Sequence, residues 1–326
     1  METNLSISVV IPTYKNREQT LRCLAALWLC NPQPDEVIVI DDGSADNTAH
    51  SVLRKYPRHV VVRLPATHGF AAAANHGMAR ASGDLLFLLD TNTEVDPSST
   101  VAILEAFSQE RDLGVAGAAL RHPDGEPRWS GGHLPSPLQC FAYASGILPI
   151  TERLKPWRWL RNHFSHRGVE VDWLSGAVVV IRRSLWEEIG PFSAGDPLRN
   201  QCIGLCLKAR EAGWKVRVSP GFSAVYSARP AADGNSGTKQ NDYQLLWNDL
   251  LQHTDSRVQA SVASPSRRAL LVGGRLRVFG RRLAAPLVPK EHRAEWRAET
   301  EACANSLKQS AMPTSDVSTE RQQIST

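Results

Sequence analysis

Short apolar runs alternate with helical patterns along the first half of the chain. Five nearly continuous apolar runs are typical of strands buried on both faces of a sheet: 5–11, 36–40, 60–64, 85–89 and 113–120. Between them, apolar residues at helical spacing or Ala-rich stretches predict helices at 18–30, 70–81 and 99–109. The succession of strand, helix and strand predicts an α/β fold with a mostly parallel central sheet flanked by helices.

Polar residues follow two of these predicted strands at the point where each strand ends. Asp41-Asp42-Gly43-Ser44 follows the second strand, and Asp90-Thr91-Asn92 follows the apolar run 85–89. The carboxyl ends of parallel strands line the binding crevice of an open sheet, so both stretches are expected at one ligand site. Asp42 is suited to accept a hydrogen bond from the ring N–H of uracil or thymine. An Asx turn or a helix cap explains an Asp-Gly-Ser sequence equally well.

The turn after the first strand excludes two common nucleotide-binding motifs. Its sequence, PTYKNRE, lacks the GxGxxG pattern that lets a pyrophosphate approach a helix N-terminus, and no GxxxxGK[ST] loop occurs in the chain. A dehydrogenase or a P-loop enzyme is therefore disfavoured. Nucleotide recognition would have to rest on side chains.

Positive charge is concentrated near the C-terminus. The 326-residue chain carries a net charge of only +4, but residues 267–293 hold eight Arg or Lys and one Glu, a local charge of +7. Arg pairs alternate with Leu, Val and Phe at 267–288, and residues 152–168 mix Arg and Lys with Trp and Phe. Both stretches suit peripheral attachment to an anionic membrane, although a surface helix is the alternative for each. No motif supports nucleic-acid binding.

Cysteine usage and the N-terminus indicate a cytoplasmic protein. The chain has no CxxC pair, it enters the first strand without a basic leader, and no apolar run approaches the roughly 18 residues that span a bilayer. Cys202 and Cys206 share a helix face, for which burial is favoured over metal binding because no matching His or Cys pair lies nearby. The six cysteines occupy positions 23, 30, 140, 202, 206 and 303.

Six stretches, in order, resemble one enzyme family. They are VVIPTYKN, VIVIDDGSADNT, HGFAAAANHGMARASGDLLFLLDTNTEV, PDGEPRWSGG, VDWLSGAVVVIRRSLWEEIGPF and LCLKAREAGWKV. Over about residues 5–226 the chain is similar to the inverting glycosyltransferases of family 2 with the GT-A fold, and most similar to the rhamnosyltransferase-like branch. The resemblance implies transfer of a sugar from a UDP- or dTDP-linked donor to a glycan or lipid-linked acceptor in cell-surface polysaccharide synthesis.

The resemblance also assigns roles to particular residues. Asp90 and Asn92 occupy the metal and diphosphate motif, where Mg²⁺ or Mn²⁺ stabilises the charge of the leaving diphosphate. The pocket for the donor sugar and the acceptor is expected at Trp173, Ser175 and Gly176. The residues expected to bind the nucleotide are Pro12, Thr13, Tyr14, Asp42 and Asn75.

Three departures from the family pattern fall on the reaction centre. Asn92 stands where the metal motif usually ends in aspartate, which weakens cation binding. Gln201 and Cys202 occupy the places of an acidic pair that supplies the general base, and neither side chain is a sound base near neutral pH. Tyr226 replaces a histidine that helps to hold metal or phosphate. Asp196 is the first candidate for a substitute base, ahead of Asp172 and Glu188.

Two hypotheses therefore compete. The chain is either an active inverting transferase or a catalytically silent homologue that binds a nucleotide sugar or a partner subunit; a nucleotide-binding regulator unrelated to sugars is a third alternative. The predicted organisation is a GT-A domain at 1–229, a basic helical extension at 230–305 and a disordered tail at 306–326. The expected location is the cytoplasm, with peripheral contact to the inner membrane face.

Overall fold

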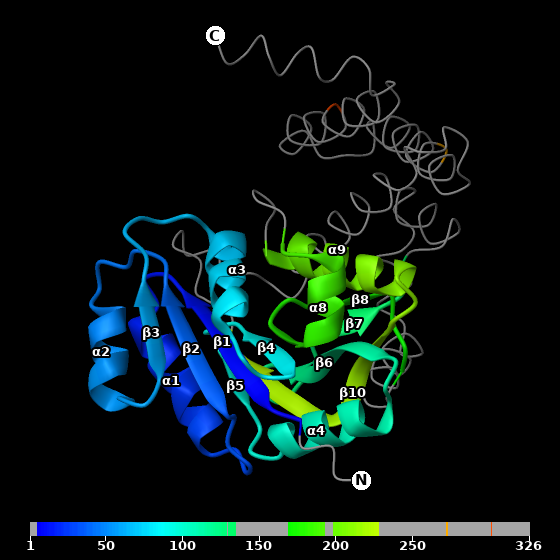
Figure 1. The fold of residues 1–326 in the computed structure, drawn as a ribbon, viewed down its shortest axis with the longest axis horizontal. Coiled ribbons are helices and arrows are strands. Elements are labelled where there is room, and N and C mark those ends of the chain that lie inside the picture. Colours follow the sequence, from blue (N-terminus) through cyan, green and yellow to red (C-terminus); the bar gives the residue numbers. More distant parts are fainter. Residues whose placement is uncertain are drawn as a thin grey trace, which may run out of the picture. The chain divides into compact units, whose positions relative to one another are not determined.

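The described part of the protein is a mixed α/β structure built on one large sheet (Figure 1). The computed structural model describes residues 5–128, 130–134, 169–192 and 198–227, together with the single positions 272 and 301. The chain divides into two compact units, Met1–His133 with Arg161–Asp249 and Leu134–Leu160 with Leu250–Thr326. All helices and strands given below belong to the first unit.

Eight strands form the main sheet, in the order β3-β2-β1-β4-β9-β6-β10-β5. The pairs among β3, β2, β1 and β4 are parallel, as is the β6–β10 pair, whereas β9 is antiparallel to both of its neighbours and β5 is antiparallel to β10. The bounds are β1 Ile7–Thr13, β2 Glu36–Asp41, β3 Val60–Arg63, β4 Leu85–Leu89, β5 Thr93–Val95, β6 Leu113–Arg121, β9 Val178–Arg182 and β10 Lys215–Tyr226. A second, two-stranded sheet pairs β7 (Gly131–Gly132) with β8 (Trp173–Leu174).

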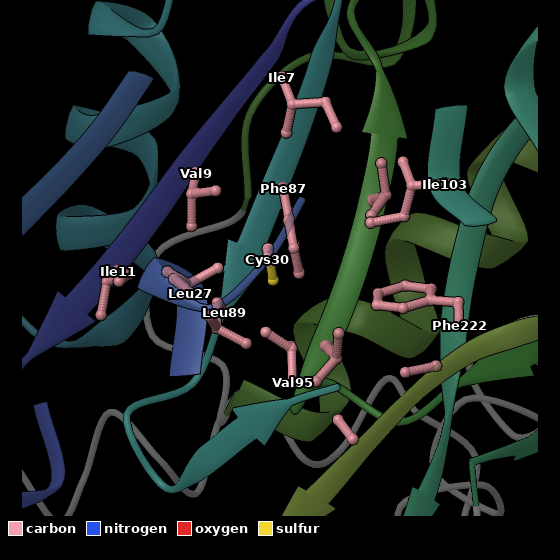
Figure 2. Packing of buried hydrophobic residues seen from close by; sticks show 14 of the residues in the cluster. Ile7, Val9, Ile11, Leu27, Cys30, Phe87, Leu89, Val95, Ile103 and Phe222 are labelled. Carbon is pink, nitrogen blue, oxygen red and sulfur yellow. The ribbon is translucent and has the colours of Figure 1, made fainter. Parts of the chain in front are cut away.

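Helices cover both faces of the sheet. On one face, α1 (Arg17–Trp28) and α4 (Ser99–Gln109) contribute to the first buried apolar cluster, part of which is shown in Figure 2. On the other face, α3 (Phe70–Arg80), α8 (Arg183–Ile189) and α9 (Leu198–Glu211) contribute to the second. The helix α2 (Thr48–Lys55) joins β2 to β3. The sheet therefore lies between two helical layers.

Alternation along the strands explains why the two apolar clusters are separate. Val9 and Ile11 of β1 point into the first cluster, whereas Val10 between them belongs to the second. Successive side chains of a strand point to opposite faces, so a strand covered on both sides is apolar at most positions. In the first cluster Phe87 and Phe222 meet edge to face, with ring centroids 5.6 Å apart (Figure 2).

The predicted elements agree closely with those observed. The predicted strands at 5–11, 36–40, 60–64, 85–89 and 113–120 and the helices at 18–30, 70–81 and 99–109 all occur, with ends shifted by at most two residues. The fold-class prediction is confirmed. The boundary at 229 and, apart from position 272, both basic stretches lie outside the described residues. Among the described helices, none is long and apolar enough to cross a membrane.

Candidate functional site

The two polar corners lie at the same edge of the sheet. Strand β1 is parallel to both β2 and β4, so the residues that follow these three strands come out on one side. The turn after β1 contacts both corners: the Lys15 N–H donates to Ser44 Oγ at 2.9 Å, and Asn16 Nδ2 donates to Thr91 Oγ1 at 3.2 Å. A single turn therefore connects the Asp42 corner with the Asp90 corner.

Asp42 organises the main chain at this edge. Its buried carboxylate accepts the N–H groups of His68 and Gly69, each at 2.9 Å, and its own N–H donates to the Thr13 carbonyl at 2.9 Å. The carboxylate thus fixes the loop that leads into α3. Each carboxylate oxygen can accept a second hydrogen bond, so recognition of a base by Asp42 stays a prediction.

Tyr14 presents an exposed ring beside Asp42, whereas Pro12 and Thr13 are buried. The Oγ1 atom of Thr13 lies 2.8 Å from Oγ1 of Thr20 in α1, so this side chain packs within the fold. Lys15 Nζ lies 4.9 Å from the Tyr14 ring centroid. Hydrogen bonds with Lys15 and Thr67 lower the pKa of the Tyr14 hydroxyl. Of the three predicted residues in this turn, Tyr14 has the surface that a base could stack on.

Asp90 and Asn92 form a closed hydrogen-bonded pair at the end of β4. Asp90 Oδ1 accepts the N–H of Asn92 at 2.7 Å and its Nδ2 at 2.8 Å, while the Asp90 N–H donates to the Ala177 carbonyl at 2.9 Å. Burial raises the pKa of Asp90, and the bonds from Asn92 and the charge of Arg128 oppose that rise. The amide oxygen of Asn92 is buried and has no hydrogen-bond partner among the described residues.

This pair fits a cation that is shared with a phosphate group. No group of three or more His, Cys, Asp or Glu side chains within the described ranges could hold a metal ion. A carboxylate oxygen of Asp90 and the unpartnered amide oxygen of Asn92 are two donors of the kind that Mg²⁺ and Mn²⁺ prefer. Mg²⁺ is commonly held by one or two carboxylates together with substrate phosphates. The donor set therefore suits a metal that binds jointly with a diphosphate.

Asn75 connects two distant segments of the chain. Its Nδ2 donates to the carbonyl of Phe192 at 2.9 Å, and its Oδ1 accepts the Phe192 N–H at 2.9 Å. Both ends of the amide thus bind the main chain of the loop after α8. In the structure Asn75 holds this loop against α3; contact with a nucleotide stays a prediction.

One of the two positions predicted for the family's acidic pair holds a buried thiol, Cys202. Cys202 in α9 has no exposed surface, and burial together with the nearby Cys206 and Asp90 raises its pKa far above the ordinary value. Burial also raises the pKa of Cys206 to about 12. Neither thiol can accept a proton as a thiolate near neutral pH. The predicted burial of this helix face is confirmed.

The other candidate bases are either paired or outside the described residues. Asp172 accepts from Arg210 Nε at 3.2 Å and lies 3.4 Å from His133 Nδ1, and Glu188 Oε2 accepts the Trp214 Nε1–H at 2.8 Å. The side chains of Asp196 and Gln201 lie outside what the structure describes.

The predicted sugar pocket borders the Asp90 corner through its main chain. Ala177, which holds the Asp90 N–H, directly follows Ser175 and Gly176. The Ser175 N–H donates to the Ser130 carbonyl at 2.8 Å, and Trp173 is buried with its Nε1 donating to the His133 carbonyl at 3.2 Å. Trp173 is therefore part of the packed structure, and a sugar contact for these residues stays a prediction.

One charged residue at this edge had no predicted role. The guanidinium of Arg128 lies over the ring of Tyr226, 4.2 Å from its centroid. Tyr226 pairs with Thr93, and the next N–H, of Ser227, donates to the Asn92 carbonyl at 2.8 Å. The PDGEPRWSGG motif includes Arg128, but nothing in its spacing indicated that the turn folds back toward Asp90.

The sheet order, together with the likeness to a solved glycosyltransferase given below, identifies the GT-A fold. Residues 8–184, more than half of the chain, match the model of the glycosyl transferase family 2, and the protein belongs to that family. The family resemblance seen in the sequence is confirmed.

The relatives and structural neighbours are distant. An N-acetylglucosaminyl-diphospho-decaprenol L-rhamnosyltransferase of Mycobacterium tuberculosis is 28% identical over 223 residues, which are 64% of this chain and 71% of the relative. A poly-beta-1,6-N-acetyl-D-glucosamine synthase of Staphylococcus aureus is 23% identical over 219 residues, 66% of this chain and 48% of the relative. The solved mannosyltransferase PcManGT from Pyrobaculum calidifontis, in complex with GDP-Man and Mn²⁺, shares the fold with a TM-score of 0.55 and 14% identity, over 94% of this chain and 86% of that one.

Proposed function

We propose that the protein transfers a sugar, with inversion, from a UDP- or dTDP-linked donor to a glycan or lipid-linked acceptor in cell-surface polysaccharide synthesis. The observation that carries the proposal is the shared edge: one turn, through Lys15 and Asn16, bonds to Ser44 at the Asp42 corner and to Thr91 at the Asp90 corner. The named activities of the distant relatives, rhamnosyl transfer to a lipid-linked sugar and synthesis of a polysaccharide, support the same substrate classes.

In this proposal each side chain at the edge of the sheet has its own role. Tyr14 stacks on the base, and Asp42 accepts the ring N–H while its oxygens continue to hold the loop before α3. Asp90 and Asn92 would hold Mg²⁺ or Mn²⁺, and the bound cation would supply positive charge for the leaving diphosphate. In this scheme Asp196 takes the proton of the acceptor hydroxyl, whose oxygen attacks the sugar carbon from the side opposite the diphosphate.

A specific observation favours the silent alternative. Cys202, at one of the two positions of the family's acidic pair, is buried, and its raised pKa keeps it protonated. If Asp196 does not supply the base, the protein would bind a nucleotide sugar without turnover and would act as a binding or partner subunit.

We further propose a cytoplasmic location with peripheral attachment to the inner membrane face. A lipid-linked acceptor would be presented at that surface. The alternating Arg and apolar residues at 267–288 suit an anionic leaflet.

A panel of nucleotide sugars tests the proposal. The full chain is melted with UDP-, dTDP- and GDP-linked sugars, with and without Mn²⁺ or Mg²⁺; a ligand at a hundred times its Kd stabilises the folded state by about 2.7 kcal/mol. Donors that raise Tm are then assayed for transfer and for hydrolysis. An active enzyme should lose turnover in Asp90→Ala and in Asp196→Ala.

The outcomes separate the hypotheses. Donor binding without turnover under either metal supports the silent homologue. If no sugar nucleotide changes Tm, both sugar-based hypotheses are wrong and a regulator binding another ligand becomes the better account.

A further inference from the structure

The position of Arg128 is fixed by a hairpin that folds back onto β6. Its N–H donates to the Leu120 carbonyl at 2.9 Å, and Arg121 forms an antiparallel bridge with Pro127. Gly125 at the tip has a φ of +83°, a conformation that glycine adopts without strain. The hairpin thus returns Arg128 to the carboxyl end of β6, on the same side of the sheet as the carboxyl end of β4, because both strands are antiparallel to β9.

The aromatic support of Arg128 belongs to the strand that borders the Asp90–Asn92 pair. Its guanidinium carbon lies 4.2 Å from the Tyr226 ring centroid, within the range of a cation–π contact. Tyr226 is paired with Thr93, and the following N–H, of Ser227, is bound to the Asn92 carbonyl. Two strands and a main-chain hydrogen bond therefore hold the Arg128–Tyr226 pair beside the motif.

The local charge makes a phosphate the fitting ligand. With Asn92 in place of an aspartate, Asp90 is the one charged side chain of the three-residue motif. Arg128 is half-buried, and its charge acts on Asp90 in the direction that lowers the pKa of that carboxyl. A guanidinium is planar, permanently charged and able to donate two parallel hydrogen bonds to one phosphate.

We propose that Arg128, held over Tyr226, binds the diphosphate of the donor at the Asp90–Asn92 corner and supplies positive charge that does not depend on a metal. This inference rests on the proposed function, because it assumes that a nucleoside diphosphate enters this edge. The protein should accordingly retain part of its affinity for nucleoside diphosphates when divalent cations are removed.

Calorimetric titration of the full chain tests this binding role. Uridine, UDP, dTDP and GDP are titrated in EDTA and in Mn²⁺ into wild type and Arg128→Gln. Hydrogen bonds to charged groups contribute about 1.5–3 kcal/mol, so Arg128→Gln should bind the diphosphates roughly 10- to 100-fold more weakly in EDTA. Affinity for uridine should stay unchanged, since the nucleoside carries no phosphate. Arg128→Lys keeps the charge without the planar guanidinium, so its affinity for the diphosphates should lie between those of wild type and Arg128→Gln.

A matched control removes an arginine at the other end of β10, the strand that carries Tyr226. Arg217 in β10 is also partly buried and pairs with Glu110, far along the strand from Tyr226. Arg217→Gln should leave diphosphate affinity in EDTA as in wild type. A similar loss in both variants would overturn the inference, because it would reflect net charge and not position.

The titration also separates this inference from the proposed function. A wild-type protein that binds none of the diphosphates in either buffer contradicts both. A wild-type protein that binds them, with Arg128→Gln binding as tightly in EDTA, contradicts the role of Arg128 alone. Should Arg128→Gln fail to fold by circular dichroism, the same comparison with wild type is made with Arg128→Lys, and undiminished diphosphate affinity in that variant contradicts the role.

Discussion

Several polar side chains that a sequence pattern would assign to a ligand are hydrogen-bonded to the main chain of the protein. Asp42 holds two N–H groups of the loop before α3, and Asn75 clamps the N–H and the carbonyl of Phe192. Buried polar groups must be paired, so residues at a site edge often serve the fold before they serve a substrate. At the Asp90–Asn92 pair the amide oxygen of Asn92 is left over. This unpartnered oxygen is the reason why we propose that an external ligand binds at the pair.

Asp90 and Asp84, at the two ends of β4, should respond to neutralisation with opposite signs. Burial raises the pKa of Asp90, whereas hydrogen bonds from Ser6 lower that of Asp84. At pH 7 the ionised Asp90 destabilises the fold, so Asp90→Asn should raise Tm by roughly 2–4 °C, which corresponds to about 1 kcal/mol in a domain of this size. Asp84→Asn should lower it.

The pH dependence provides the check on this sign. The stability that the raised pKa of Asp90 contributes is fully present below the ordinary value of 3.8 and is lost as pH rises through the raised pKa. The gain in Tm for Asp90→Asn should therefore shrink as melts are moved from pH 7 toward pH 4. If Asp90→Asn is less stable than wild type at pH 7, the ionised carboxylate of Asp90 does not destabilise the fold.

At the scale of elements, the site depends on strands and helices that meet closely. Strand β9 lies between β4 and β6, antiparallel to both, and the residue just before it, Ala177, holds the Asp90 N–H. Helix α3 packs on β1 and β2 through Gly77, where a Cβ would overlap with Val10 Cγ1 and would lie 3.1 Å from Ile40 Cγ1. The close packing of α3 at Gly77 thus helps to position β1 and β2, which end at Thr13 and Asp41.

Gly77→Ala should destabilise the protein although alanine is the better helix former. Helix propensity alone predicts a gain of up to about 1 kcal/mol, whereas the overlap with the two strands should cost about 1–3 kcal/mol. Urea unfolding of the variant should show a net loss of stability. The control is Ala72→Gly on the exposed face of α3, which isolates the propensity. Net stabilisation by Gly77→Ala would mean that α3 can move away from the sheet at no cost.

At the scale of the whole molecule, the family assignment covers residues 8–184, and the described fold continues to residue 227. Within this part, sequence patterns located five of the strands, three of the helices and both polar corners, because burial on two faces requires nearly continuous apolar runs and strand ends collect polar residues. They did not locate β9 or α2 in advance. They also could not assign Arg128, whose neighbour Tyr226 is 98 positions away in the chain.

We predict membrane attachment of the full chain from the basic stretch near its C-terminus. The chain should float with vesicles that contain about 30% anionic phosphatidylglycerol, should not float with neutral phosphatidylcholine, and should be released by high salt. Each basic residue near an anionic surface contributes about 1 kcal/mol, so neutralising four of them should weaken binding well over tenfold. The four substitutions, combined in one variant, are Arg267→Gln, Arg268→Gln, Arg281→Gln and Arg282→Gln.

A matched variant controls for net charge. It removes four exposed cations from α1, α2 and the turn after α2, and it should bind the vesicles as wild type does. Equal loss in both variants, or binding to neutral vesicles, would contradict a specific role for the C-terminal stretch. The control substitutions are Arg22→Gln, Arg54→Gln, Lys55→Gln and Arg58→Gln.

The sequence by itself determined the α/β class, the family and the two corners that carry Asp42 and Asp90, since these follow from the order of apolar runs and from motifs contiguous in the chain. Tertiary structure decided which polar groups form hydrogen bonds within the protein and which have no partner among the described residues. It paired Asn75 with Phe192 and brought Arg128 over Tyr226 beside Asn92. Hydrogen bonds and burial depend on neighbours that are distant in the chain, and only folding brings those neighbours together.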